Sequence, residues 1–152
     1  IDPHKSEIVY KKYYNVGFAA DTPKGLLVPV IKDADRLSIA EIAENMLGLA
    51  ERGREGKLDV QEMRGGTFTV TNLGAIGGTF VIPTINYPEV AILGLGRAVE
   101  RPVVKDGEIV VRKMLPMTIA YDHRLVDGAD AARFLNDVIA RLEDPTRLFV
   151  ES

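Results

Sequence analysis

The sequence predicts an α+β domain, a two-layer sandwich in which a mixed, largely antiparallel sheet carries helices on one face. Three observations support this fold class. Short runs rich in β-branched and aromatic residues fill much of the chain, two segments show apolar residues at helical spacing, and turn signals join neighbouring strands. The chain has 152 residues, of which 46% are hydrophobic, so we expect a single domain, residues 1–152, with a real core.

The first half of the chain predicts two strands and a helix. The strands are residues 8–20, IVYKKYYNVGFAA, and residues 25–31, GLLVPVI, joined by a Pro/Gly turn. Ser38 and Glu41 form a capping-box pattern, so a helix is predicted to begin there and to end near the glycines of residues 52–57, RGREGK. One apolar face of this helix is expected to comprise Ile39, Ile42, Ala43, Met46, Leu49 and Ala50.

The second half predicts further strands and a second helix. Residues 67–74, TFTVTNLG, and residues 90–98, VAILGLGRA, have strand patterns separated by a glycine-rich loop without periodicity. Asp106-Gly107 between apolar runs predicts a hairpin that continues into residues 108–121, EIVVRKMLPMTIAY. An amphipathic helix is predicted from about Gly128 until Pro145, with Ala131, Phe134, Leu135, Val138, Ile139 and Leu142 on its apolar face.

Composition excludes several kinds of function. The chain has no cysteine, which rules out a thiol nucleophile, a Cys-ligated zinc and a disulfide framework. The net charge is −3 and basic residues are scattered among acids, so we expect no nucleic-acid or membrane partner. There is no apolar run long enough to cross a bilayer, and the first residues have no signal-peptide pattern. GLGR, residues 94–97, lies inside a strand pattern, so no dinucleotide or P-loop site is predicted.

His123 is the candidate for chemistry, because it lies in residues 121–130, YDHRLVDGAD, where a strand pattern stops and a helix pattern starts. The simpler interpretation is a half-buried histidine satisfied by backbone groups. Asp127 favours a functional interpretation, since it can cap the following helix or hold an arginine, and Gly128 permits close approach of the backbone. The other histidine, His4, lies in a polar segment and is expected to be exposed.

Several motifs together resemble one family. Residues 123–128, HRLVDG, resemble the His-x-x-x-Asp-Gly motif of CoA-dependent acyltransferases. The wider context resembles the catalytic domain of the dihydrolipoamide acyltransferase (E2) component of 2-oxo acid dehydrogenase complexes, in residues 11–35, 68–78, 88–96 and 114–135. The resemblance implies a chloramphenicol acetyltransferase-like fold. Related chloramphenicol acetyltransferases and peptide-synthetase condensation domains carry a second histidine before the motif, where this chain has Asp122, which favours the E2 component.

Acyl exchange between two thiols needs a base, because a thiol with a pKa near 8.5 is mostly protonated at neutral pH. Histidine is the side chain suited to accept that proton, and without cysteine a direct attack is simpler than an acyl-enzyme. The resemblance implies that His123 is the general base, that Thr71 donates to the oxyanion, and that Asp127 organises the site, partly through a salt bridge. Taken alone, Thr71 is more simply interpreted as a strand-end threonine, which its β-branching favours.

The resemblance also implies substrates and partners. The substrates would be coenzyme A and lipoamide, the latter on a lipoyl domain outside this chain, with no metal. The protein would form a homotrimer, or a larger cage when complete, with His123 of one subunit facing Thr71 of the next. Its partners would be the E1 decarboxylase and the E3 dihydrolipoamide dehydrogenase. The expected location is the cytoplasm of a prokaryote or the mitochondrial matrix of a eukaryote.

Alternatives remain at this point. The resemblance covers about the last two-thirds of such a catalytic domain, without the early helical region that helps build the trimer and supplies an arginine near the motif aspartate; the lipoyl and subunit-binding domains are also absent. A non-enzymatic trimeric core inactivated by truncation, or a small-molecule CoA-dependent acetyltransferase, would keep the motif. The GAIGG and NYPEVAILG segments favour an acetyl or branched-chain acyl group over a succinyl group.

Overall fold

The computed structural model describes residues 7–147. Along the chain, its elements are β1 (Val16–Phe18), β2 (Ala20–Thr22), β3 (Gly25–Leu27), β4 (Val30–Ile31), the 3-10 helix η1 (Ala34–Arg36), α1 (Ile39–Arg54), the 3-10 helix η2 (Val60–Met63), β5 (Phe68–Asn72), β6 (Ala91–Leu95), β7 (Val99–Lys105), β8 (Glu108–Met114), β9 (Met117–Tyr121) and α2 (Gly128–Glu143). His4 lies outside the described residues.

The centre of the fold is a five-stranded sheet in the order β4-β1-β5-β6-β9. Its two inner pairs, β1–β5 and β5–β6, are parallel, and its two outer pairs, β4–β1 and β6–β9, are antiparallel. Two further antiparallel hairpins, β2–β3 and β7–β8, stand beside it. The mixed, largely antiparallel arrangement predicted from the sequence is therefore confirmed.

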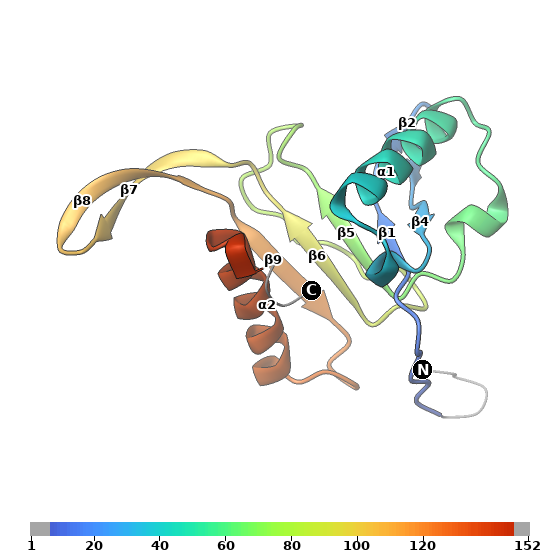
Figure 1. Cartoon of the computed structure of the whole chain (residues 1–152). Coiled ribbons are helices and arrows are strands. Elements are labelled where there is room, and N and C mark those ends of the chain that lie inside the picture. Colours follow the sequence, from blue (N-terminus) through green and yellow to red (C-terminus); the bar gives the residue numbers. More distant parts are fainter. Residues whose placement is uncertain (1–6, 148–152) are drawn as a thin grey trace.

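Both helices lie on the same face of this sheet (Figure 1). Register shows why: Val16 lies between Ile31 and Phe68, so these three side chains share a face. Ile31 packs in a core cluster with Leu49 of α1, while the Phe68 ring lies 5.4 Å from the Phe134 ring of α2. The α+β sandwich with helices on one face is confirmed.

The opposite face is covered by the irregular segment between β5 and β6, residues 73–90. A side chain at Gly94 would come within 3.0 Å of Val81 and 3.2 Å of Pro83, and Val81 is buried. A Cβ at Gly96 would lie 2.5 Å from the backbone oxygen of Thr79. These glycines let the loop pack directly onto the sheet, because no side chain intervenes.

The predicted helix ends are confirmed. Ser38 Oγ accepts a bond from the Glu41 amide at 3.3 Å, and Glu41 Oε2 accepts one from the Ser38 amide at 2.8 Å, which completes the capping box of α1. Gly56, with φ of 70°, follows the end of that helix. Helix α2 runs from Gly128 to Glu143 and stops before Pro145.

Three strand predictions were too long. Residues 8–15 were predicted as strand, but the first strand begins at Val16. The side chain of Asn15 bonds instead to the Gly65 carbonyl and the Asp33 amide, each at 2.9 Å. The other two predicted strands are interrupted at Pro29 and Pro116, residues that have no amide hydrogen to donate to a ladder.

The predicted apolar faces of the helices are only partly buried. On α1, Leu49 is buried, but Ile39 is 66% exposed. On α2, Ala131 is buried, whereas Phe134 and Leu142 are exposed. The buried core is consequently smaller than the sequence predicted, and it centres on Phe18, Ile31 and Leu49.

The hairpin of β7 and β8 projects away from the rest of the molecule (Figure 1). Asp106 and Gly107 both have positive φ, of 52° and 84°, as a two-residue type I′ turn requires. The predicted Asp-Gly hairpin is therefore confirmed. Its cross-strand partners Val104 and Ile109 are 75% and 79% exposed, so this arm carries apolar side chains into solvent.

Candidate active site

His123 follows the last strand of the sheet, as the sequence predicted. Tyr121 is the final residue of β9 and pairs with Ala91 at the start of β6. The Asp122 amide then donates to the Val90 carbonyl at 2.8 Å. This bond continues the pairing of β9 with β6 by one residue beyond Tyr121. The His123 side chain is exposed, and its ring lies 5.5 Å from the Tyr121 ring, tilted by 44°. The imidazole is thus accessible to a ligand.

Asp122 and Arg124, on either side of His123, form an ion pair through several side-chain hydrogen bonds. Arg124 Nε donates to Asp122 Oδ1 at 2.9 Å, and Nη2 donates to Oδ2 at 2.5 Å. The same carboxylate accepts the backbone N–H of Arg124 at 3.1 Å. These hydrogen bonds from Arg124 lower the pKa of Asp122 to about 2, so the carboxylate is ionised at any working pH.

Asp127 caps the helix that follows. Its Oδ1 accepts the backbone N–H of Asp130 at 2.9 Å, at the start of α2. The capping predicted from the sequence is confirmed. Within residues 7–147 of this single chain, the Asp127 side chain pairs with no cation, because Arg124 is held by Asp122 and Arg133 pairs with Asp130. The salt bridge that the resemblance implied for Asp127 stays a prediction.

Thr71 lies near the end of β5, opposite Gly94 of β6. Strand alternation puts it on the face that the loop 73–90 covers. The loop begins with a tight turn in which the Leu73 carbonyl accepts the backbone N–H groups of Ile76, Gly77 and Gly78, at 3.1 to 3.3 Å. Thr71 itself is half-buried, at the edge of this covered region.

Thr71 and His123 lie at opposite ends of the sheet within one chain. Thr71 pairs in register with Gly94 of β6, and Gly94 in turn pairs with Thr118 of β9. Three residue steps from Thr118 to Tyr121 cover about 10 Å along the strand, and two strand spacings add about 10 Å across the sheet. His123 lies beyond Tyr121, so its imidazole cannot contact the Thr71 hydroxyl of the same chain.

Sequence reasoning missed a buried carboxyl group, that of Glu89. It is 8% exposed and accepts hydrogen bonds from Thr69 Oγ1 at 2.6 Å and from Asn86 Nδ2 at 3.2 Å. Burial raises the pKa of Glu89, against the lowering effects of Thr69, Asn86 and Lys11. A signal was present in the PEVAILG segment, where an acid lies two residues before a buried strand. Glu89 helps to line a cavity of about 770 Å³ that Leu125 and several aromatic side chains also line.

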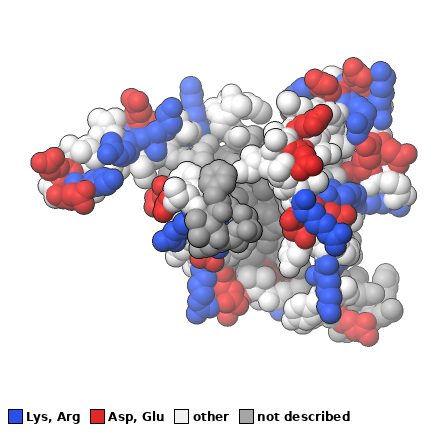
Figure 2. Space-filling view, in the orientation of Figure 1, with Lys and Arg blue, Asp and Glu red and all other residues white. Residues whose placement is uncertain are grey.

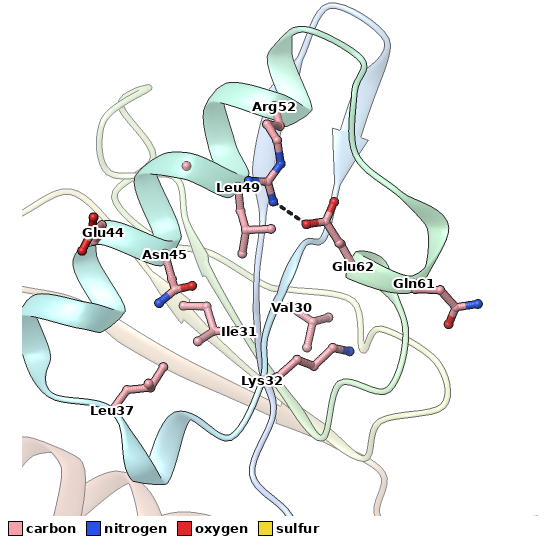
Figure 3. Close-up of a pocket in the computed structure, with 11 residues that line it drawn as sticks. Val30, Ile31, Lys32, Leu37, Glu44, Asn45, Leu49, Arg52, Gln61 and Glu62 are labelled. Carbon is pink, nitrogen blue, oxygen red and sulfur yellow. Dashed lines mark hydrogen bonds and ion pairs between the residues drawn. The ribbon is translucent and has the colours of Figure 1, made fainter.

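A second cavity, of about 650 Å³, lies at the other edge of the sheet (Figure 3). Val30 and Ile31 of β4 form its floor, α1 and η2 flank it, and Arg52 pairs with Glu62 across it. Its lining contains no histidine, and the strand that it borders, β4, is the edge strand farthest from β9. It is therefore separate from the region around His123.

The surface charge, the potential metal ligands and the helices of the described residues bear on what the protein can bind. Over the face in Figure 2, Lys and Arg alternate with Asp and Glu, also along the β7–β8 arm. Within residues 7–147, no three His, Cys, Asp or Glu side chains lie together as a metal site would require. Neither described helix is long and apolar enough to span a bilayer.

Comparison with known proteins identifies the class to which this fold and site belong. Residues 1–150 match the model of the 2-oxoacid dehydrogenases acyltransferase (catalytic domain) family, and the chain belongs to that family. It is 49% identical, over its whole length, to the dihydrolipoyllysine-residue acetyltransferase component of the pyruvate dehydrogenase complex of Bacillus subtilis. The chain spans 34% of the length of that relative.

Two solved structures are similar at a TM-score of 0.90. One is the dihydrolipoamide acetyltransferase of Azotobacter vinelandii, 46% identical over 97% of this chain and 60% of that one. The other is the cubic core of a pyruvate dehydrogenase multienzyme complex, 45% identical with the same coverage. Work on the Azotobacter enzyme concerns a serine, a histidine and an asparagine in its catalytic mechanism; the serine precedes the histidine by 52 residues and the asparagine follows it by four.

Proposed function

We propose that this protein transfers an acetyl group between dihydrolipoamide and coenzyme A. The observation that carries the proposal is a match in the spacing of three residues along the sequence. Thr71 precedes His123 by 52 residues and Asp127 follows it by four, as the serine and asparagine do in the Azotobacter acetyltransferase. The acetyl group is preferred over a branched-chain group because the similar curated relatives are acetyltransferases of pyruvate dehydrogenase complexes.

His123 acts as the general base in this proposal. Its imidazole takes the proton from the thiol of coenzyme A, and the resulting thiolate attacks the thioester carbonyl of acetyl-dihydrolipoamide. The tetrahedral intermediate then collapses, the imidazolium returns its proton to the departing dihydrolipoyl thiolate, and acetyl-CoA is released. The exposure of His123 at the end of β9 supports this role, because both thiols must reach it.

Thr71 stabilises the negative charge on the intermediate from a neighbouring subunit. A hydroxyl can donate to the oxyanion, and removal of such a donor typically costs about 10²- to 10³-fold in rate. Since Thr71 and His123 of one chain lie at opposite ends of the sheet, the donor has to come from another copy. We therefore propose a site shared between subunits of a homotrimer.

Assembly is further supported by uncovered apolar surface. Val104, Ile109 and Phe134 are exposed in the single chain, although burial of such side chains is favourable. We propose that the trimer forms part of a larger core, as in the similar cubic core structure, and that the E1 and E3 components are its partners in the complete complex.

Complementation between two inactive variants tests the proposal. His123→Ala and Thr71→Val should each lose most of the transfer rate from acetyl-CoA to dihydrolipoamide, and Thr71→Ser should largely retain it. Thr71→Val should lower kcat with little change in KM, because the hydroxyl acts on charge that develops in the transition state. Mixed and allowed to exchange subunits, the two variants should regain activity, since a mixed trimer contains one interface with both residues intact.

Other outcomes contradict specific parts of the proposal. Absence of recovery after verified subunit exchange would exclude the shared site. A parent protein that is trimeric but transfers no acetyl group would instead favour a purely structural core. The control is the double variant that carries both substitutions. Mixed with either single variant it should regain no activity, because every subunit in that mixture lacks the same one of the two groups.

A further inference from the structure

We infer that Asp122 and Arg124 are positioning residues that hold the turn carrying His123, and that Asp122 does so through the main chain rather than through the imidazole. This inference rests on the proposed function, because it assigns the orientation of the proposed base. It concerns two residues that flank His123 and that the spacing of Thr71, His123 and Asp127 does not include.

Asp122 is the centre of the hydrogen bonds in this turn. Its backbone N–H donates to Val90, and its carbonyl accepts the backbone N–H groups of Leu125 at 2.9 Å and Val126 at 3.0 Å. Its carboxylate accepts three donors of Arg124, namely the backbone N–H, Nε and Nη2. The residues before and after His123 are consequently fixed to each other and to β6.

The imidazole is left out of this arrangement. Within the described chain, the Asp122 carboxylate accepts no hydrogen bond from His123, since its oxygens face Arg124, and the imidazole lies against the Tyr121 ring instead. An aspartate that oriented a histidine directly would have to accept from a ring nitrogen. Asp122 instead sets where the main chain of His123 lies, and the ring of Tyr121 limits how the imidazole can turn.

The ion pair adds little to global stability by itself. The Arg124 side chain is 74% exposed, and ion pairs with a solvent-exposed member contribute little to the net stability of a fold. Loss of the pair should therefore loosen the turn without unfolding the domain. A displacement of about 1 Å at a reacting group is enough to cost about 10²-fold in rate, so the effect should appear in catalysis.

The chain offers a matched control in Arg133. Its side chain is also 74% exposed, and it pairs with Asp130 at 2.8 Å within α2, so the pair does not include a residue that flanks His123. Arg133→Gln removes an Arg–Asp pair whose arginine is equally exposed, although its aspartate is 66% exposed where Asp122 is 20% exposed. If ion pairs matter here only for general stability, Arg124→Gln and Arg133→Gln should behave alike.

The test combines kinetics with a spectroscopic signal from His123. In the protein, Arg124→Gln and Asp122→Ala should lower kcat by about 10- to 100-fold with little change in either KM, while Arg133→Gln stays within twofold. Asp122→Asn should lie between parent and Asp122→Ala, because it can still accept the Arg124 backbone N–H. The chain has only two histidines, so a His4→Gln background gives a single imidazole signal by ¹⁵N-edited NMR.

The imidazole signal separates this inference from the proposed function. In the parent, the Tyr121 ring should shift the ring protons of His123, and Asp122→Ala should move them toward free-histidine values while Arg133→Gln leaves them in place. An unchanged signal in a folded Asp122→Ala variant would overturn the inference, even if kcat fell. A shifted signal in a protein that transfers no acetyl group would support the positioning role and refute the proposed activity.

Discussion

Glu89 shows how one buried side chain can hold a loop to a sheet. It ends the irregular segment 73–90 and accepts a hydrogen bond from Thr69, which is fully buried on β5, and another from Asn86 within the loop. Buried polar groups are costly when they lose their partners. Replacement of Glu89 should therefore disturb the attachment of the loop.

Two substitutions separate the charge of Glu89 from its hydrogen bonds. Glu89→Ala leaves Thr69 and Asn86 without a partner and opens a cavity, so it should lower the free energy of unfolding by about 2 to 4 kcal/mol. Glu89→Gln can accept from Asn86 and donate to the Thr69 hydroxyl, so its cost should be below about 1 kcal/mol. Urea denaturation at pH 7 measures both values; equal losses would contradict the hydrogen-bond explanation.

The pH dependence of Glu89 has a definite sign. Burial raises its pKa in the folded state, so the folded protein binds this proton more tightly than the unfolded chain does. The stabilising contribution of the protonated group is fully present below the unfolded pKa and is lost as the pH rises through the folded pKa. The Glu89→Gln variant should consequently gain stability relative to the parent as the pH rises through this window, and a difference that runs the other way would contradict the raised pKa.

Helix α2 begins at Gly128, a residue that also belongs to the His-x-x-x-Asp-Gly motif. Asp127 caps the helix through the Asp130 amide, next to the turn that carries His123. A capping side chain and its helix set the direction in which the preceding turn leaves. The capping of α2 by Asp127 therefore also influences how the turn that carries His123 is held.

Substitution of Asp127 should affect stability according to capping ability. Asp127→Ala should cost about 1 kcal/mol of unfolding free energy, because it removes the acceptor for the Asp130 amide. Asp127→Asn should cost only a few tenths, since asparagine caps about as well, and it should retain transfer activity. Thermal unfolding with an activity assay checks this. An Asn variant as inactive as the Ala variant would show that the carboxylate charge is required.

The elements that the sequence predicted well are those with a local signal. The capping box at Ser38, the Asp-Gly turn at Asp106 and the His123 junction each depend on a few adjacent residues, and each is present in the structure. Strand lengths were less predictable, because whether residues 8–15 pair depends on a neighbouring strand, which no local pattern reveals. The partial exposure of the helix faces and the burial of Glu89 likewise depend on contacts between distant segments.

The separation of Thr71 and His123 within one chain could not be derived from the strand patterns alone. The resemblance implied that His123 of one subunit faces Thr71 of the next, and the register puts the two residues of one chain at opposite ends of the sheet. Strand direction decides this: β5 and β6 run in parallel and β9 runs against them, so the end of β5 lies near the start of β9. That information becomes available only with the topology.

For the whole molecule, the β7–β8 arm carries the exposed apolar pair of Val104 and Ile109. If the arm packs on another subunit, Val104→Lys with Ile109→Lys should shift the solution mass from trimer toward monomer. The hairpin itself should persist, because its Asp106-Gly107 turn and its ladder remain.

Light scattering and circular dichroism test this expectation. The matched control is Leu26→Lys, at a side chain 68% exposed on β3, away from the arm. A mass unchanged by the double substitution would show that the arm lies outside the interface, and dissociation by Leu26→Lys would show that the effect is not specific to the arm.

The distance between Thr71 and His123 in one chain has a quantitative consequence for mixed populations. If each subunit contributes its histidine to one site and its hydroxyl to another, a subunit lacking both groups disables two of the three sites in a ring. The active fraction of sites in randomly mixed rings then follows the square of the fraction of intact subunits, so half-damaged material keeps about a quarter of its sites. Self-contained sites would give a straight line, and titration of intact with doubly substituted subunits distinguishes the two curves.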